Sequence, residues 1–519
     1  MLEKIKKLPY FNDLLKVLLT LLLCLPLLFI NIRNDIDWGD DNSHYLLQAK
    51  YISEGTPQAN TQYIYNSNCP VLGPAAYPVG FPLMLSVVYF FKGLNLHAFS
   101  LVLTMALIAL CFMMVLFYRK THHFITSVFL VLIIAYNPWT LNFKSEIMSE
   151  IPFTVILLFT LLLYGKFKNI YSFIFVGLLC GYLISIRTIG VVLPLGILAE
   201  TTRNSIIAIK RKETTYGETA KKVLINIGMI FSSCFGLYFL LNYVVFKIPS
   251  DPASGYLSIF SLQNLDAIFL KNLANYTETL KYFFNPHNNK WIFLPLITKS
   301  FVFTMILLGF IKKMFRNAGV SDFFVVMYML VLLVYPYNNS GFRFLFPLLP
   351  FFMSYAVIGL KSIHLGFTLK TPAKAILLGS LVLVQYIYGI NEIKRSESVI
   401  QEGPCVADSW AVFDYIKNQT PPDAVIAFVK PRALVLFTNR KCITNNSDQT
   451  ETATFIRKFD EVGVTYYLLY CQKPDEPSGG LLSEMINLPL QKYIDASPGE
   501  ISLCWSNQRF KLYKKTGSK

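Results

Sequence analysis

The sequence predicts an all-α polytopic membrane domain with interfacial helices, followed by a small soluble α/β domain. Hydrophobic residues make up 54% of the 519 residues, and charged residues make up only 15%, compared with roughly 25% in soluble proteins. The apolar residues gather in runs of about 20, the length needed to cross a bilayer. A backbone inside a bilayer must satisfy its hydrogen bonds internally, so each run is predicted to be a helix.

About eleven apolar runs qualify as membrane spans. The first is interpreted as a retained span rather than a signal peptide, because no small-residue cleavage site follows Asn31. A different division around Arg187 would give an even number of spans and move the C-terminal tail across the membrane. The spans are predicted at residues 14–32, 97–118, 123–141, 151–165, 171–187, 189–208, 223–246, 294–311, 321–337, 344–361 and 373–390.

The net charge of +16 comes from basic residues that flank the apolar runs. This distribution is typical of orientation by positive cytoplasmic loops and argues against nucleic acid as a partner. With the N-terminus inside, the short outside loops hold only Lys144, Arg187 and Arg343 as prominent cations. The inside segments hold Lys4, Lys6, Lys7, Arg119, Lys120, Lys166, Lys168, residues 203–222, Lys312, Lys313, Arg316, Lys361 and Lys370.

This charge asymmetry places residues 33–96, residues 247–293 and the tail from about residue 391 outside the cytoplasm. The composition favours a multi-pass protein of a bacterial inner membrane. The predicted domains are therefore a transmembrane domain over residues 1–390 and a soluble extracytoplasmic α/β domain over residues 391–519.

The outside segments have predicted structure of their own. Residues 79–91 are apolar but too short to span, so they are expected to lie along the membrane interface, and residues 41–52 are expected to form a short amphipathic helix. In the tail, helices are predicted at 408–418 and 451–462, with strands at 424–429, 465–471 and 510–513. These regions also hold five cysteines that allow one or two disulfides of undetermined pairing, namely Cys69, Cys405, Cys442, Cys471 and Cys504.

Four carboxylates stand within seven residues at the start of the first outside loop. Asp40 and Asp41 end this group, and either can cap the helix predicted to begin near Asn42. Because adjacent side chains point in different directions, one carboxylate can cap the helix while the other faces a cavity. His44 follows one helical turn later and could join a set of metal ligands.

A second group of charged residues precedes the span at 151–165. Glu150 suits the first turn of a helix, where the dipole favours an acid and where Pro152 is tolerated. Glu146 lies one turn earlier and shares a face with Glu150 if the helix extends back that far. Lys144 is the basic residue of this segment.

Arg187 and Arg343 are isolated cations on the same predicted side of the membrane. Ionisable residues beside spans are costly and often functional, although each arginine alone could reach the interface with its long side chain. Guanidinium groups bind phosphate through paired donors, and a carboxylate can act as general base. Together these groups suit displacement at a sugar carbon whose leaving group is a lipid phosphate.

The arrangement resembles the C superfamily of membrane glycosyltransferases (GT-C). Within it, the closer resemblance is to the group of protein O-mannosyltransferases and lipid A aminoarabinose transferases. The resemblance covers roughly residues 14–390. It rests on the Asp40-Asp41 pair and on four further segments, at residues 77–82, 149–152, 187–190 and 343–350.

The resemblance implies an inverting transfer of a hexosyl or pentosyl group from a polyprenyl-phosphate donor to an extracytoplasmic protein, lipid or glycan, without a nucleotide. It makes Asp40 or Asp41 the base, and the choice stays open because the group commonly has Asp-Glu where this chain has Asp-Asp. It places Arg187 and Arg343 at the donor phosphate. The residues expected to bind the donor or its sugar are Lys144, Glu146, Glu150 and Tyr77.

The sequence also allows a bound divalent metal ion and two functions other than glycosyl transfer. Asp41, Glu150 and His44 would suit Mg²⁺ or Mn²⁺ better than a structural zinc. The chain could also be a transporter or flippase of lipid-linked saccharides, or a non-catalytic membrane protein that binds a partner through its tail. A transporter is expected to carry charges near the middle of the membrane, whereas these charges gather at one rim.

Overall fold

The computed structural model describes residues 11–66, 69, 73–166, 169–213, 215–249, 264–284, 293–336, 341–362, 371–396, 402–445, 452–471 and 488–516. Lys4, Lys6, Lys7, Lys168 and Lys370, used above for orientation, lie outside these residues. The chain divides into two compact units. The first unit comprises Met1–Ile32, Ser100–Val244 and Phe260–Glu397, and the second comprises Arg33–Phe99, Val245–Ile259 and Ser398–Lys519.

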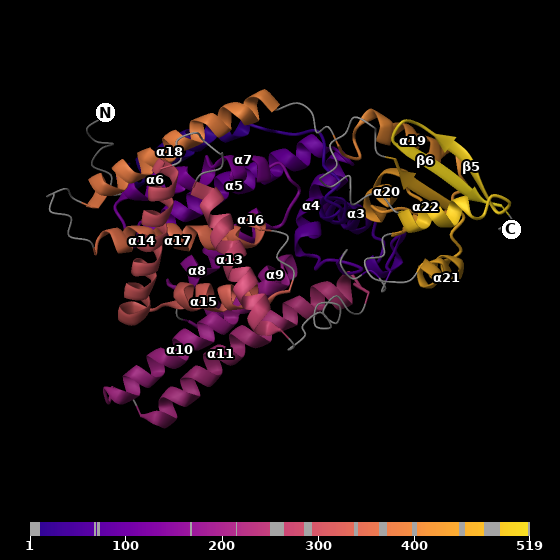
Figure 1. Ribbon diagram of the computed structural model, residues 1–519. Coiled ribbons are helices and arrows are strands. Elements are labelled where there is room, and N and C mark those ends of the chain that lie inside the picture. Colours follow the sequence, from indigo (N-terminus) through magenta and orange to yellow (C-terminus); the bar gives the residue numbers. More distant parts are fainter. Residues whose placement is uncertain are drawn as a thin grey trace. The chain divides into compact units, whose positions relative to one another are not determined.

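The first unit is helical, and each predicted span contains at least one helix. Figure 1 shows α10 and α11 side by side in this unit. The α-helices are α2 (Phe11–Cys24), α5 (Leu96–Tyr118, which begins in the second unit), α6 (Phe124–Ala135), α7 (Pro138–Phe143), α8 (Glu150–Tyr164), α9 (Ile170–Ile186), α10 (Val192–Lys210), α11 (Tyr216–Phe239), α13 (Leu265–Phe284), α14 (Phe293–Asn317), α15 (Val320–Val334), α16 (Phe342–Leu345), α17 (Leu349–Leu360) and α18 (Thr371–Ser396).

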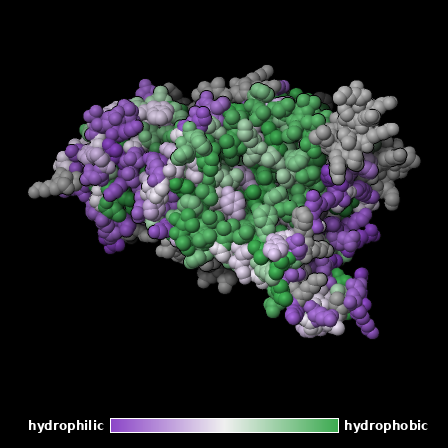
Figure 2. Space-filling model, turned by 180° about the vertical axis from the view of Figure 1, so that it is seen from behind, coloured by the Kyte–Doolittle hydropathy of each residue, from purple (hydrophilic) through white to green (hydrophobic). Residues whose placement is uncertain are grey.

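Three stretches among the described residues are long and apolar enough to cross a membrane, by length and composition: Leu96–Tyr118, Tyr216–Val245 and Phe342–Leu360. Some of the other predicted spans contain shorter or broken helices. Residues 123–141, for example, divide into α6 and α7, where Pro138 begins α7 and the Asn137 side chain accepts a hydrogen bond from the Trp139 backbone N–H at 2.9 Å. The count of eleven spans therefore stays a prediction. Figure 2 shows hydrophobic side chains over a wide area of one face.

Helix α13 was not predicted from the sequence. Its segment was assigned to an outside loop because polar residues interrupt its apolar ones. One of these polar residues, Asn272, is buried, and its amide donates to the carbonyl oxygens of Leu332, Leu333 and Tyr335 at 3.1, 3.1 and 2.6 Å. Carbonyls at the end of a helix lack partners within that helix, so Asn272 satisfies the C-terminal end of α15.

Glycines allow helices of the first unit to pack with their backbones close together. In α14 and α17, an added Cβ at Gly309 would collide with the Tyr355 carbonyl oxygen, and one at Gly359 with the Met305 carbonyl oxygen. Small residues at helix crossings are typical of membrane proteins, where close backbone packing replaces the hydrophobic effect. This reciprocal contact fixes α14 against α17.

The second unit is built on a six-stranded sheet of order β1-β3-β2-β4-β6-β5. The first four strands in that order are parallel, whereas β6 pairs antiparallel with both β4 and β5. Strands β5 and β6 form the hairpin visible in Figure 1. The elements are α3 (Asp41–Ser53), β1 (Tyr63–Ile64), α4 (Gly80–Lys92), α19 (Ala407–Gln419), β2 (Val425–Ala427), α20 (Pro431–Thr438), β3 (Lys441–Ile443), α21 (Thr452–Val462), β4 (Tyr466–Tyr470), α22 (Leu488–Asp495), β5 (Ile501–Ser506) and β6 (Phe510–Lys515).

Every helix and strand predicted for the outside segments is present in this unit, and α20, β3, α22, β5 and β1 are additional. Strand β1 comes from the first long loop, which the sequence division had placed in the transmembrane domain. It pairs with β3 of the tail in the register Tyr63–Cys442 and Ile64–Ile443. Trp38 of the same loop is 2% exposed and lies against the aromatic rings of Phe413, Phe428 and Phe510. The loop and the tail therefore share one core. All nine cysteines, each of them described, are free thiols.

Candidate functional site

The Asp40–Asp41 pair stands at the start of α3. Asp40 occupies the N-cap position with a φ of 59°, a conformation that costs a non-glycine residue roughly 1–3 kcal/mol. Its side chain makes no capping hydrogen bond, so the structural role offered by the sequence is not observed. Asp37 organises this turn instead, because its Oδ1 accepts from the Gly39 N–H at 2.9 Å and from the Asn42 amide at 3.0 Å. The strained backbone at Asp40 thus begins an adjacent pair of carboxylates, of which Asp40 makes no capping hydrogen bond.

Arg432, at the start of α20, faces both carboxylates. Its Nε lies 3.6 Å from Asp40 Oδ2, and its Nη1 lies 3.7 Å from Asp41 Oδ1. The Arg432 and Asp40 side chains are 1% and 4% exposed, whereas Asp41 is 26% exposed. Burial raises the pKa of Asp40, and the charges of Arg432 and Lys430 oppose that rise. Arg432 therefore favours the ionised form of a carboxyl group whose protonated form is favoured by burial.

Tyr77 and His44 complete this cluster. The Tyr77 hydroxyl donates to Asp41 Oδ1 at 2.6 Å, and the buried Gln48 amide holds the Tyr77 backbone through its N–H and C=O at 3.1 and 2.9 Å. The His44 ring packs edge-on against Tyr63 and Tyr77. Burial and the Arg432 charge lower the pKa of His44 well below its usual range. His44 is therefore neutral at pH 7.

A second polar cluster lies in the first unit. Glu150, in the first turn of α8, is fully buried, and its Oε1 lies 2.6 Å from Arg187 Nη1 and 3.0 Å from Arg343 Nε. The two arginine side chains are 14% and 21% exposed. Arg187 also donates to the Ser149 hydroxyl at 2.9 Å. One carboxylate thus holds two guanidinium groups together and leaves the cluster with a net positive charge.

Local backbone structure brings these three residues together. Arg187 follows α9 in an extended conformation, and Arg343 lies in the short helix α16. After Arg187 the chain turns back on α9 so tightly that a Cβ at Gly190 would lie 2.9 Å from the backbone of Leu183. Gly190, part of the segment at 187–190 that carried the resemblance, is thus required where Arg187 is positioned.

Two of the predicted donor-binding residues lie outside these contacts. Lys144 is fully buried, and its ammonium group donates to the Asn31 carbonyl oxygen at 3.3 Å and the Thr104 hydroxyl at 3.1 Å. Glu146 lies in a bend before α8, and α8 begins only at Glu150. The condition for Glu146 and Glu150 to share a helical face is therefore not met, because the helix does not extend back to Glu146.

The residues suggested as metal ligands do not form a metal site. Asp41 and His44 lie in the second unit, where the Arg432 charge acts on both. Glu150 lies in the first unit, where it pairs with two guanidinium groups. Among the described residues, no group of three or more His, Cys, Asp or Glu side chains could hold a metal ion. The donor chemistry thus does not fit Mg²⁺ or Mn²⁺, since positive groups already face these acids.

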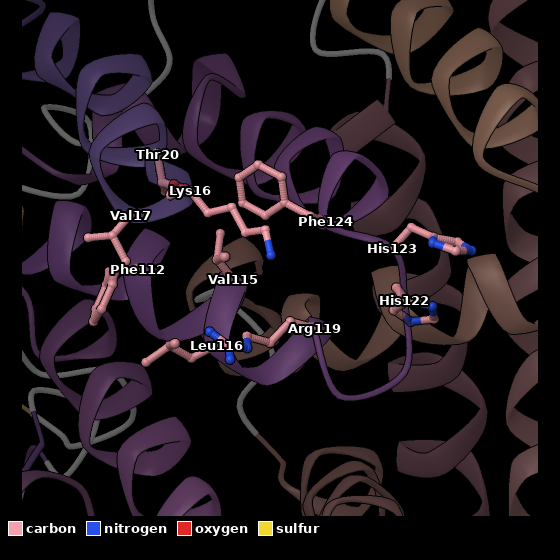
Figure 3. Close-up of a pocket in the computed structure, with 10 residues that line it drawn as sticks. All are labelled: Lys16, Val17, Thr20, Phe112, Val115, Leu116, Arg119, His122, His123 and Phe124. Carbon is pink, nitrogen blue, oxygen red and sulfur yellow. Dashed lines mark hydrogen bonds between the residues drawn. The ribbon is translucent and has the colours of Figure 1, made fainter. Parts of the chain in front are cut away.

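Each unit also has a cavity that none of the predicted site residues line. The first unit has one of about 280 Å³, where Lys16 lies alongside the Phe124 ring and Arg119, His122 and His123 contribute further basic groups (Figure 3). Its basic lining is what the charge analysis predicts for the cytoplasmic ends of spans. The second unit has an open cavity of about 620 Å³ that includes Asp35, Lys92 and Trp410.

Arg432 is the functional candidate that the sequence did not reveal. The available signal was Lys430-Pro431-Arg432 directly before the apolar run Ala433–Phe437, which puts a cation at the start of a buried helix. Only the fold shows that this helix packs against α3, about 390 residues earlier in the chain.

The structure resembles solved membrane glycosyltransferases over most of its length. ArnT from Cupriavidus metallidurans, solved bound to undecaprenyl phosphate, matches with a TM-score of 0.60 and 11% identity over 97% of this chain and 98% of ArnT. The archaeal oligosaccharyltransferase AglB from Archaeoglobus fulgidus, in complex with an inhibitory peptide and a dolichol-phosphate, matches with a TM-score of 0.53 and 12% identity over 88% of this chain and 69% of AglB.

A mycobacterial arabinofuranosyltransferase, AftD, matches with a TM-score of 0.50 and 10% identity over 98% of this chain and 42% of AftD. Comparisons of the sequence with protein families and with curated proteins gave no match. At identities this low the likeness establishes the fold. With its long apolar helices, the chain is an integral membrane protein that has the fold of the GT-C superfamily of membrane glycosyltransferases, as its sequence motifs predict.

Proposed function

We propose that the protein is an inverting glycosyltransferase that moves a sugar from a polyprenyl-phosphate donor to an acceptor outside the cytoplasm. The observation that carries the proposal is the Asp40–Asp41 pair, in which Asp40 has a strained backbone and makes no capping hydrogen bond. Strain of this kind concentrates at functional sites. The GT-C fold supplies the class of reaction to which such a pair belongs.

In the proposed reaction, one carboxylate of the pair takes a proton from the acceptor nucleophile. The nucleophile attacks the anomeric carbon of the sugar, and the bond from that carbon to the lipid phosphate oxygen breaks, so the phosphate leaves with the electron pair. A single displacement of this kind inverts the configuration. Asp41, which is 26% exposed and accepts from Tyr77, is open to the acceptor, whereas Asp40 is buried.

The leaving phosphate is assigned to Arg187 and Arg343. Glu150 contacts both guanidinium groups, and both arginine side chains remain partly exposed, so a phosphate can approach the two cations together. The structures of ArnT with undecaprenyl phosphate and of AglB with a dolichol-phosphate make a lipid phosphate the natural ligand to test. A divalent cation is not part of the proposal, because the acids are already paired with arginines.

The orientation proposed from charge requires the first long loop and the tail to lie on the same side of the membrane. Strand β1 of the first long loop and β3 of the tail pair in one sheet, so both segments lie on the same side of the bilayer. The chain between them must then cross the bilayer an even number of times, which is consistent with the ten spans predicted between residues 97 and 390. Because the predicted inside loops are positively charged, we propose that this sheet lies on the extracytoplasmic side of the membrane. The proposed membrane is a bacterial inner membrane.

Purified protein in detergent should consume at least one member of a panel of synthetic polyprenyl-phosphate hexoses and pentoses. We expect Asp40→Asn/Asp41→Asn to lower turnover about 10²–10⁴-fold, as loss of a general base does, while the protein remains folded. The two single variants identify the base. Full activity of the double variant would overturn the proposal, and the donor consumed would identify the sugar.

The phosphate assignment has its own test. Arg187→Gln and Arg343→Gln should each raise KM for the donor about 10–100-fold, because a hydrogen bond to a charged group contributes about 1.5–3 kcal/mol. Arg203→Gln is the matched control, since Arg203 binds the Ala318 carbonyl oxygen at 3.2 Å and lies on the predicted inside. An unchanged KM for the donor in both test variants would show that the donor phosphate does not bind Arg187 or Arg343.

A further inference from the structure

We infer that Arg432, contributed by the C-terminal part of the chain, is a positioning residue that holds the Asp40–Asp41 pair in its ionised, reactive arrangement. The inference rests on the proposed function, in which one of these carboxylates is the base. It gives the tail a role in the reaction, since α20 places Arg432 against α3.

The guanidinium group of Arg432 is held on several sides. Its Nη2 donates to the Pro74 carbonyl oxygen at 2.9 Å. Its Cζ lies 5.2 and 5.4 Å from the ring centroids of Tyr63 and Tyr77, within the range of cation–π contacts. Its remaining nitrogens face Asp40 and Asp41. A group fixed in this way has little freedom to move to a substrate and is suited to orient its neighbours.

The geometry also distinguishes Arg432 from a substrate-binding residue. Arg432 is 0% exposed, unlike Arg187 and Arg343, which are 14% and 21% exposed. At 3.6 and 3.7 Å from the two carboxylates, it makes charge contacts without the short hydrogen bonds that would occupy their lone pairs. Arg432 thus balances the charge of both carboxylates without itself donating a short hydrogen bond to either.

The charged and titratable groups that act on this pair come from several elements. Burial raises the pKa of Asp40, Asp41 raises it further, and Arg432 and Lys430 lower it. Tyr63 and Cys442 also face this charge, and His44 and Tyr77 face Arg432. Among these groups, Lys430 and Arg432 supply the positive charge, since burial and Arg432 keep His44 neutral. Removing Arg432 leaves Lys430 and the backbone N–H of Ala433 to oppose the rise in the pKa of Asp40 that burial causes.

The test is the pH dependence of kcat/KM in full-length protein carrying Arg432→Gln or Arg432→Lys. The base works only when ionised, so activity is lost as the pH falls through its pKa. Without the arginine charge that pKa rises, and the acidic limb should move to higher pH by at least about one unit in Arg432→Gln. The shift should be smaller in Arg432→Lys, which keeps a positive charge. At pH values well above the shifted acidic limb, the turnover of both variants should largely recover.

Arg509→Gln is the matched control. Arg509 is in the same unit, its side chain is 14% exposed, and its Nε lies 3.4 Å from Asp408 Oδ2. Its loss should lower thermal stability without moving the acidic limb. A lowered Tm with an unchanged pH profile in both Arg432 variants would reduce Arg432 to a structural role and overturn the inference. A raised donor KM with an unchanged profile would make it a substrate-binding residue, which also overturns it.

A measurement that needs no turnover separates this inference from the proposed function. Infrared absorption of protonated carboxyl groups, recorded against pH for native protein and Asp40→Asn, gives the titration of Asp40 itself. If no donor is consumed but Arg432→Gln still moves this titration upward, the proposed function fails and the positioning role stands. If donors are consumed and the titration does not move, the positioning role alone fails.

Discussion

Glu150 sets the charge balance of the cluster that contains Arg187 and Arg343. It is fully buried and contacts both guanidinium groups, so its loss would remove the carboxylate that lies between two like charges. Breaking a buried ion pair from one side is strongly destabilising because the remaining charge stays desolvated. The partial exposure of both arginines lets an incoming anion take the place of the lost carboxylate.

We therefore expect Glu150→Gln to destabilise the protein by about 3–5 kcal/mol and lower its Tm by several degrees. Added polyprenyl phosphate should restore part of this loss, because its phosphate supplies the missing negative charge. Thermal unfolding in detergent, with and without the lipid, measures both effects. Glu461→Gln is the control, since Glu461 is 52% exposed and pairs with Lys458 on the surface. An equal Tm in the two variants would contradict the role of Glu150 as the carboxylate that stabilises the two arginines.

At the residue scale, the sequence located the Asp40–Asp41 pair, Glu150 and the two arginines because charged residues are rare in an apolar chain and conspicuous at the ends of its runs. It could not show that Asp37 takes over the local hydrogen bonds, since that depends on a backbone φ of 59° at Asp40. Lys144 was conspicuous for the same reason, but the sequence could not show its contacts with Asn31 and Thr104.

At the scale of elements, α14 and α17 depend on a crossing that leaves no room for side chains at Gly309 and Gly359. We expect Gly359→Ala to lower the free energy of unfolding by about 1–3 kcal/mol, the usual range for overpacking. The new Cβ would collide with backbone atoms, which cannot move aside as a side chain can. The Tm in detergent reports this loss. Gly236→Ala in α11 is the control, because nothing lies within 4 Å of its Cβ position. A similar Tm for both variants would show that α14 and α17 can separate.

Sequence reasoning performs well for elements whose signal is local. Apolar length located the helices of the first unit, and alternation of helical and strand-like segments located β2, β4 and β6. Helix α13 was missed because its apolar residues are interrupted by polar ones such as Asn272, which has its partners at the end of α15. Strand β1 is only two residues long, and its partner is far along the chain, so nothing local marks it.

At the scale of the whole molecule, Trp38 ties the first long loop to the tail. Trp38→Ala should destabilise the second unit by about 3–5 kcal/mol, as removal of a buried aromatic side chain does, and should make residues 398–519 sensitive to protease. Limited proteolysis of the native protein in detergent measures this. Trp410→Ala should change stability by less than about 1 kcal/mol, because Trp410 is 48% exposed. Equal sensitivity in the two variants would mean that the tail folds independently of the loop.

The sheet that joins β1 to β3 also bears on how the chain is made. At about 5–20 residues per second, tens of seconds of synthesis separate Tyr63 from Cys442, its partner in the sheet. During that time the loop core has no partner, and the intervening helices must insert so that both flanks emerge on the same side. A chain with one helix inserted wrongly cannot close its sheet and leaves the apolar surface around Trp38 exposed to proteases. Closure of the sheet thus depends on the correct insertion of every helix between its two halves.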